Sequence, residues 1–332
     1  MRDPAFWWRK PGLRTSLLSP LAAVYGAIAA RRIARVGAHV GVPVLCVGNF
    51  TLGGAGKTPA AIAIARMLTD AGESVFCLSR GYGGSEAGPK LVDAHADTAA
   101  QVGDEALLLA RATPTIVARD RVAGAQLARV KGASVIVMDD GLQNGTIAKD
   151  FTLAVVDGLR GVGNGRVFPA GPLRAPLSAQ LARANAVLVV GEDTGAGEVI
   201  RLADACRLPV LHGRLVPKAA AVTALKAHKV LAFAGIGDPE KFFATVAAAG
   251  IVIAAKKSFS DHHRYTAEEA AALVMDAEHE NLTPLTTEKD HARMCGDPTL
   301  AALFARAQVL PVTMAVTETE ELRKLTMDAL GP

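Results

Sequence analysis

The chain has 332 residues, half of them hydrophobic and 20% charged, which allows a sizeable core and two domains and argues against long disordered stretches. Its four cysteines lie far apart and form no CxxC pair, which argues against a disulfide framework or a zinc site. The net charge of +4 arises in residues 1–40, with seven basic side chains and one acidic one, so the net-negative remainder is not expected to bind nucleic acid.

The first predicted element is an amphipathic segment within residues 1–40. Aromatic residues 6–8 stand beside Arg9 and Lys10, and an apolar run from Leu17 to Ala30 precedes three more arginines. Fourteen residues are too few to span a bilayer, whereas tryptophans and flanking cations suit the headgroup region of a membrane. We therefore expect a membrane-surface helix. The alternative is a helix packed on the body of the protein with its cations in solvent.

A glycine-rich loop comes next. A predicted strand over 43–48 leads into TLGGAGKT, and an alanine-rich helical run follows over 59–68. Glycines let backbone N–H groups converge on phosphate oxygens, while the following helix directs the positive end of its dipole at the same anion. Lys57 then contacts the β- and γ-phosphates, and the Thr58 hydroxyl ligates Mg²⁺. The predicted nucleotide-binding residues are Thr51, Leu52, Gly53, Gly54, Ala55, Gly56, Lys57 and Thr58.

Departures from related loop patterns narrow the choice of nucleotide. Thr51 takes the first glycine position of GxxxxGK(S/T), so a glycine-rich turn without a nucleotide is the alternative. Leu52 stands where ATPases that form nucleotide-sandwich dimers carry a lysine. GTP-specific proteins usually recognise guanine with an Asn/Thr-Lys-x-Asp segment, and TEKD at 287–290 lacks the residue between lysine and aspartate. These differences favour ATP and a metabolic kinase over a switch or partitioning ATPase.

Acidic residues follow two further predicted elements. A strand over 134–138 ends in Asp139 and Asp140, at the edge where parallel sheets place metal ligands opposite a phosphate loop. These acids and Thr58 are the predicted Mg²⁺ ligands, and an Asp-Gly turn is the alternative. Asp104 begins an apolar helix, where an acid also serves as a cap, so the residues alone leave its role open.

Histidines and arginines supply the remaining candidates. The segment FSDHHRYT, residues 259–266, places His262 beside an acid, and histidine accepts a proton near neutral pH. Paired surface histidines are the alternative. Arg80, Arg160 and Arg174 lie in or near glycine-rich loops and are candidate contacts for anionic groups, although solvated arginines fit the same spacing.

The order of elements predicts an α/β fold. Strand-like runs alternate with helical patterns, as in a doubly wound sheet; they cover 74–78, 114–117, 134–138, 151–156, 185–190, 209–211, 229–234, 250–254 and 308–312. We expect the N-terminal segment at 1–40, a P-loop kinase domain with a mostly parallel sheet at 41–215, and a smaller α/β domain at 216–332. Because His262 falls in the second domain, closure of the cleft is expected to assemble the site.

Taken in order, several segments resemble the tetraacyldisaccharide 4′-kinase family of lipid A biosynthesis. They cover much of residues 42–290 and comprise VGNFTLGGAGKTP, LSRGYGG, VGDEALLLA, DDGLQN, DGLRGVGNGRVFPAGPLR, FSDHHRYT and TTEKD. The resemblance implies that ATP, with Mg²⁺, phosphorylates the 4′-hydroxyl of a lipid A disaccharide 1-phosphate to form lipid IVA. It also implies a peripheral enzyme on the cytoplasmic face of the bacterial inner membrane, without nucleic acid or an obligate protein partner.

The resemblance also assigns residues. The family's catalytic pair, the acid of its GDE motif and the first histidine of its DHH motif, corresponds to Asp104 and His262, with Lys57 as the catalytic cation. Tyr82 is implied on the substrate side, together with the candidates Arg80 and Arg174.

One position departs from the family. Ala175 replaces the usual glutamate of PLREP, so either this glutamate is dispensable for metal binding or another acid such as Glu105 or Asp157 takes part. Two other functions stay open: a soluble P-loop kinase or ligase acting on a small metabolite, and a regulatory ATPase that would tolerate the loss of His262.

Overall fold

Buried apolar strands form the centre of the protein. In β1 (Val44–Asn49) all six residues are buried, and successive side chains enter hydrophobic clusters on opposite faces of the sheet. Burial on both faces is typical of parallel strands covered by helices. The structure, a computed structural model, describes residues 3–331.

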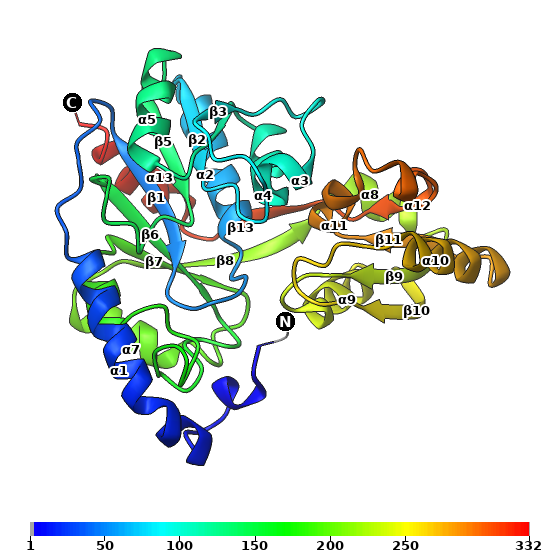
Figure 1. Ribbon diagram of the computed structural model, residues 1–332, viewed down its shortest axis with the longest axis horizontal. Coiled ribbons are helices and arrows are strands. Elements are labelled where there is room, and N and C mark those ends of the chain that lie inside the picture. The colour runs from blue at the N-terminus through cyan, green and yellow to red at the C-terminus, as the bar shows by residue number, and fades with distance from the viewer. Residues whose placement is uncertain (1–2, 332) are drawn as a thin grey trace.

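The large domain is built on a nine-stranded sheet (Figure 1). Its strands, in spatial order, are β13 (Val312–Val316), β8 (Val210–Pro217), β7 (Ala186–Val190), β6 (Phe151–Asp157), β1, β5 (Val135–Asp139), β2 (Val75–Ser79), β4 (Thr115–Val117) and β3 (Lys90–Leu91). The two edge strands, β13 and β3, run antiparallel to their neighbours, and the other pairs are parallel. The predicted doubly wound, mostly parallel sheet is confirmed.

Helices cover both faces of this sheet. One face carries α2 (Lys57–Asp70), α4 (Asp104–Ala110) and α13 (Thr319–Asp328), with the short α3 (Ala99–Val102) just before α4. The other face carries α5 (Arg121–Val130), α6 (Leu177–Leu181) and α7 (Gly197–Ala205). The core therefore lies in two layers, and the carboxyl ends of the parallel strands remain open to the second domain.

The small domain has its own parallel sheet. Its strands, in spatial order, are β10 (Val252–Ser258), β9 (Lys229–Ala234), β11 (Thr283–Thr286) and β12 (Gln308–Val309). Helices α8 (Ala219–Leu225) and α9 (Pro239–Ala248) pack on one face. The other face carries α10 (Ala267–His279), α11 (Glu288–Met294), α12 (Ala301–Arg306) and the 3₁₀ turn η2 (Pro298–Leu300).

The end of the chain returns to the large domain. The chain enters the small domain after Pro217 and leaves it before Val312, and these two residues pair in the antiparallel β8–β13 ladder. The small domain is therefore shorter than the expected 216–332. The run expected as one strand over 308–312 is two, because Pro311 lies between β12 and β13 and has no N–H to donate to a sheet.

The N-terminal segment forms the 3₁₀ turn η1 (Ala5–Trp8) and the 21-residue helix α1 (Leu13–Ile33). One side of α1 packs on the large domain, where a Cβ at Gly26 would lie 3.6 Å from the Pro176 ring. The opposite side exposes Leu13, Leu17, Leu21, Val24, Tyr25 and Ile28. The helix extends beyond both ends of the fourteen-residue apolar run on which the sequence prediction was based. Over its full length, α1 is long and apolar enough to cross a membrane, judged by length and composition alone.

Candidate active site

A cavity of about 1770 Å³ lies at the carboxyl edge of the large sheet. Its lining comes from both domains and includes the glycine-rich loop, the ends of β2 and β5, and residues 261–262 and 287–289 of the small domain. Strand β1 ends here with β5 on one side and β6 on the other. Such a switch in strand order is where open α/β sheets bind ligands.

The glycine-rich loop connects β1 to α2. Gly53 and Gly56 have φ values of +97° and +90°, in the region that favours glycine over other residues. Around Gly54, no atom lies within 4 Å of the position that a Cβ would take. Helix α2 begins at Lys57, so its first N–H groups and the positive end of its dipole lie at the end of this loop. These features make the loop a cradle for a phosphate group.

Lys57 is buried and held at the floor of the cavity. Its Nζ donates to Asn49 Oδ1 at 3.2 Å and lies 3.4 Å from Asp140 Oδ1. Asn49 Nδ2 in turn donates to the Gly53 carbonyl at 3.0 Å. Asn49 therefore ties the lysine to the loop. The sequence prediction missed this residue, and its position at the end of the strand before the loop was the available signal.

The predicted metal ligands come together beside this lysine. Thr58 Oγ1 donates to Asp139 Oδ2 at 3.0 Å. Burial, with the nearby Glu105 carboxylate, raises the pKa of Asp139 to about 7. Oδ1 of Asp139 and Oδ1 of Asp140 are buried and accept no hydrogen bond from residues 3–331. Of these two oxygens, Asp140 Oδ1 faces the Lys57 ammonium at 3.4 Å, and Asp139 Oδ1 lies in no ion pair within residues 3–331. Carboxylates beside a threonine hydroxyl fit Mg²⁺, which commonly takes one or two carboxylates and completes its shell with phosphate oxygens.

Arg174 is engaged by neighbouring protein groups. Its Nη1 lies 3.1 Å from Asp140 Oδ2, and its Nε donates to the Thr51 carbonyl at 2.9 Å. Burial opposes ionisation of Asp140, but Lys57 and Arg174 outweigh it and lower the pKa of this carboxyl. Arg174 lines the cavity. Its contacts tie it to Asp140 and the loop, and its contact with a substrate stays a prediction.

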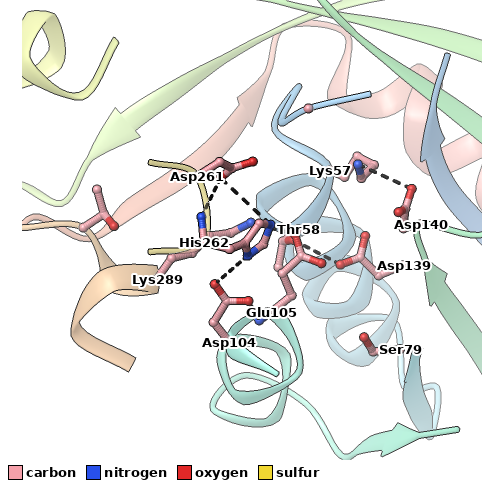
Figure 2. Close-up of polar contacts among 12 residues, drawn as sticks. Lys57, Thr58, Ser79, Asp104, Glu105, Asp139, Asp140, Asp261, His262 and Lys289 are labelled. Carbon is pink, nitrogen blue, oxygen red and sulfur yellow. Dashed lines mark hydrogen bonds and ion pairs between the residues drawn. The ribbon is translucent and has the colours of Figure 1, made fainter. Parts of the chain in front are cut away.

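The two residues of the predicted catalytic pair meet across the domains (Figure 2). His262 Nδ1 lies 3.4 Å from Asp104 Oδ2, and Asp104 is 3% exposed against 32% for His262. Arg293 Nε donates to the same Asp104 oxygen at 2.7 Å. Burial favours the protonated form of Asp104, but the hydrogen bond with His262 and the charge of Arg293 have a larger effect in the opposite direction. The pKa of Asp104 is therefore lowered, and the carboxylate is held ionised.

His262 and Asp104 are already in contact in this structure, so no further closure of the domains is needed to bring them together. Helix α11 lies against α4, and Arg293 of α11 also donates to Asp290 Oδ1 at 2.9 Å and to the Gly235 carbonyl at 2.7 Å. These bonds fix Arg293 within the small domain while it binds Asp104 of the large one. The sequence prediction missed Arg293, because its contact depends on how two distant helices dock.

Tyr82 and Arg80 extend the lining away from the catalytic pair. The Tyr82 ring lies edge-on to His262 with 5.0 Å between ring centroids, and its side chain is 62% exposed. Arg80 is also exposed and lines the same cavity. Tyr82 is thus placed to meet a ligand that approaches His262, and Arg80 is open to a ligand elsewhere in the cavity.

Arg160 has a different role from the one its spacing suggested. Its guanidinium lies 4.9 Å from the Trp8 ring centroid and 2.7 Å from an Asp238 oxygen of the small domain. Trp7 anchors the same N-terminal turn, because its Nε1 donates to the Pro169 carbonyl at 3.1 Å. Arg160 therefore ties the N-terminal turn to the small domain and is not among the residues that line the cavity.

Ala175 and the two acids considered beside it, Glu105 and Asp157, differ in their surroundings. Ala175 is fully buried, and its carbonyl accepts a hydrogen bond from Gln180 Nε2 at 2.7 Å. Asp157 is bound by Lys241 and by two backbone N–H groups. Glu105 lines the cavity and pairs with Lys289, whose Nζ lies 2.7 Å from Glu105 Oε1. Of the two candidates, Glu105 is the one that faces the site.

Comparison with known proteins gives a consistent result. The sequence pattern of the family described as tetraacyldisaccharide-1-P 4′-kinase matches residues 14–330. Tetraacyldisaccharide 4′-kinase of Rhodopseudomonas palustris (strain BisB5) is 52% identical over all of this chain and 97% of its own length. The enzyme of that name from Methylobacterium sp. (strain 4-46) is 52% identical over the whole of both chains. The crystal structure of LpxK from Aquifex aeolicus in complex with ATP matches with a TM-score of 0.73 and 25% identity, over 96% of this chain and all of the other.

Proposed function

Because the chain belongs to the tetraacyldisaccharide-1-P 4′-kinase family, we propose that it transfers the γ-phosphoryl group of ATP to the 4′-hydroxyl of a tetraacyldisaccharide 1-phosphate. The product in lipid A biosynthesis would be lipid IVA. The observation that carries this proposal is the His262–Asp104 contact, which lies in the same cleft as the glycine-rich loop. A regulatory ATPase that hydrolyses ATP without a lipid acceptor would tolerate the loss of His262.

The residues divide the reaction between the two domains. The loop and Lys57 hold the β- and γ-phosphates, and they neutralise charge on the group in transfer. Nδ1 of His262 faces Asp104, so the acceptor for the sugar proton is Nε2, which lies 3.9 Å from Asp261 Oδ1. The oxygen freed of this proton attacks the γ-phosphorus, the bond to the β-phosphate oxygen breaks, and ADP leaves. Asp104 orients the ring and stabilises the imidazolium.

The reaction product gives a direct check on the acceptor. Purified protein, ATP, Mg²⁺ and tetraacyldisaccharide 1-phosphate in detergent should give a lipid with one added phosphate. Phosphorus NMR should place that phosphate on the 4′-oxygen of the sugar distal to the original phosphate. Addition elsewhere, or phosphorylation of a small polar metabolite in preference to the lipid, would support the soluble-kinase alternative instead.

We also propose that Thr58, Asp139 and Asp140 hold Mg²⁺, with Glu105 as the acid that compensates for Ala175. Held by these residues, the cation would supply positive charge that neutralises the phosphoryl group in transfer. The proposal is supported by the buried Asp139 Oδ1, which accepts no hydrogen bond from residues 3–331, and by the Thr58–Asp139 hydrogen bond.

This metal site predicts a pH-dependent affinity. The raised pKa of Asp139, about 7, means that the carboxyl is protonated below neutrality and must lose its proton to bind a cation. Mn²⁺ binding, followed by electron paramagnetic resonance, should therefore strengthen as the pH rises towards about 7 and level off above it. Asp139→Asn should weaken binding and remove this dependence, whereas Asp193→Asn, at an exposed acid outside the cavity, should change neither. Equal binding by wild type and Asp139→Asn would exclude this ligand.

The exposed side of α1 supports attachment to a membrane surface. Its opposite side is packed on the large domain, and basic residues stand at both ends of the apolar run. We propose that the helix lies in the headgroup region with its apolar side chains turned to lipid. Since ATP is supplied by the cytoplasm, the proposed location is the cytoplasmic face of the inner membrane.

A pair of double substitutions tests this attachment. Leu17→Glu with Val24→Glu should reduce co-sedimentation with phosphatidylglycerol vesicles at least about tenfold, because two exposed apolar side chains lose their lipid contact. The matched control, Val130→Glu with Met275→Glu, changes two equally exposed apolar residues elsewhere and should co-sediment like wild type. Equal loss in both variants would contradict the assignment. Resistance of the wild type to alkaline carbonate extraction would indicate that α1 spans the bilayer.

A further inference from the structure

A lysine of the small domain reaches the active site next to the catalytic pair. Lys289 lies in the first turn of α11, which Thr287 caps by accepting a hydrogen bond from the Asp290 N–H at 3.1 Å. The Lys289 side chain crosses to the large domain, where its Nζ lies 2.7 Å from Glu105 Oε1. Figure 2 shows it beside Glu105 and His262, on the side of the cleft opposite Lys57.

The surroundings of this ammonium group are those of the reaction centre. Its partner Glu105 directly follows Asp104, and both residues lie in the first turn of α4. Lys289, Glu105 and His262 all line the cavity that contains the glycine-rich loop. A phosphoryl group held by the loop and facing His262 would therefore lie between two lysines from different domains.

Docking of the domains does not explain why a lysine is needed here. Arg293, one turn further along α11, already joins the domains through Asp104 and is itself held by Asp290 and Gly235. A second ion pair that is partly buried adds little stability, because the loss of hydration and solvent screening offset the attraction. Phosphoryl transfer, in contrast, spreads negative charge over three oxygens that cations must neutralise. Lys57 can approach them only from the loop.

We propose that Lys289 is a second phosphate-binding cation, which moves from Glu105 to an oxygen of the γ-phosphoryl group when ATP binds. The inference rests on the proposed kinase function and adds a residue to its site. Lys289 forms and breaks no covalent bond. It supplies positive charge from the small domain, so the domain that carries His262 also detects whether the γ-phosphate is present.

Comparison of ATP with ADP separates this role from a structural one. Lys289→Met should weaken ATP binding about 10- to 100-fold, the loss expected for one hydrogen bond to a charged group, and should lower kcat. Its affinity for ADP, measured by the same calorimetric titration, should stay within about twofold of wild type, because ADP has no γ-phosphate. Lys289→Arg should recover part of the preference for ATP.

A matched lysine controls for loss of charge. Lys257 pairs with Asp276 on the exposed part of the same domain at 2.9 Å, and Lys257→Met should bind both nucleotides like wild type. An equal fall in ATP and ADP affinity for Lys289→Met, or no change in either, would overturn the proposal. Phosphoryl transfer by the wild type tests the kinase function separately, so a failure of one inference is distinguishable from a failure of the other.

Discussion

Replacement of Lys57 by methionine is expected to reduce the rate of phosphoryl transfer by about 100- to 1000-fold or more. Its ammonium is the cation nearest the start of α2, held by Asn49 Oδ1 at 3.2 Å and by Asp140 at 3.4 Å. Methionine keeps most of the length of the side chain but neutralises no charge on the phosphates. Steady-state transfer at saturating ATP should show the loss in kcat, because the missing contact is strongest in the transition state.

The fold should survive this change. Asp140 keeps its ion pair with Arg174, so the substitution does not leave this carboxylate without a cation. Thermal unfolding should therefore shift little, while Lys131→Met, at an exposed lysine after α5, should leave both stability and rate unchanged. If the Lys57→Met protein retains more than about half of the wild-type kcat, the glycine-rich loop does not take part in phosphoryl transfer as proposed.

The second large effect is expected at the catalytic pair. His262→Ala and Asp104→Asn should each lower turnover by about 100- to 10,000-fold, the range for loss of a general base or of the group that orients it. Asparagine is the better replacement for Asp104, because alanine would leave the buried Arg293 with one fewer partner. ATP affinity should be nearly unchanged in both variants, since neither residue belongs to the glycine-rich loop.

The neighbouring histidine supplies the control. His263 stacks on Phe259 and its Nε2 lies 2.7 Å from Glu269 Oε2, so it belongs to the packing of the small domain. His263→Ala should cost stability and leave kcat within about twofold of wild type. Near-normal turnover in His262→Ala, or equal losses in the two histidine variants, would exclude His262 as the proton acceptor.

Local patterns in the sequence were enough to predict the strands and helices that hold the site in the large domain. The glycine-rich loop lies between a strand and a helix, and Asp139 and Asp140 follow a buried strand, so the topology alone brings them to one edge. Strand β11 escaped prediction because it is short and contains Pro284, a residue that argues against a strand. The return of the chain to the large sheet as β13 was also not predicted, because its antiparallel partner β8 lies about a hundred residues earlier in the sequence.

Contacts between domains were the harder part of the site to predict. The Asp104–His262 pair came from family resemblance, not from the spacing of the residues. The contacts of Arg293 with Asp104 and of Lys289 with Glu105 depend on α11 docking on α4, and no pattern within either helix specifies that docking. The roles of the arginines were hard to predict for the same reason. The spacing of residues does not show whether an arginine is paired within the protein, as Arg174 is with Asp140.

Transfer of label from γ-³²P-labelled ATP tests the central claim most directly. The purified protein should move the label to a lipid spot on thin-layer plates when tetraacyldisaccharide 1-phosphate is supplied in detergent. His262→Ala should abolish most of this spot while still binding ATP. Release of labelled inorganic phosphate at the same rate with and without the lipid, and no labelled lipid, would contradict the account.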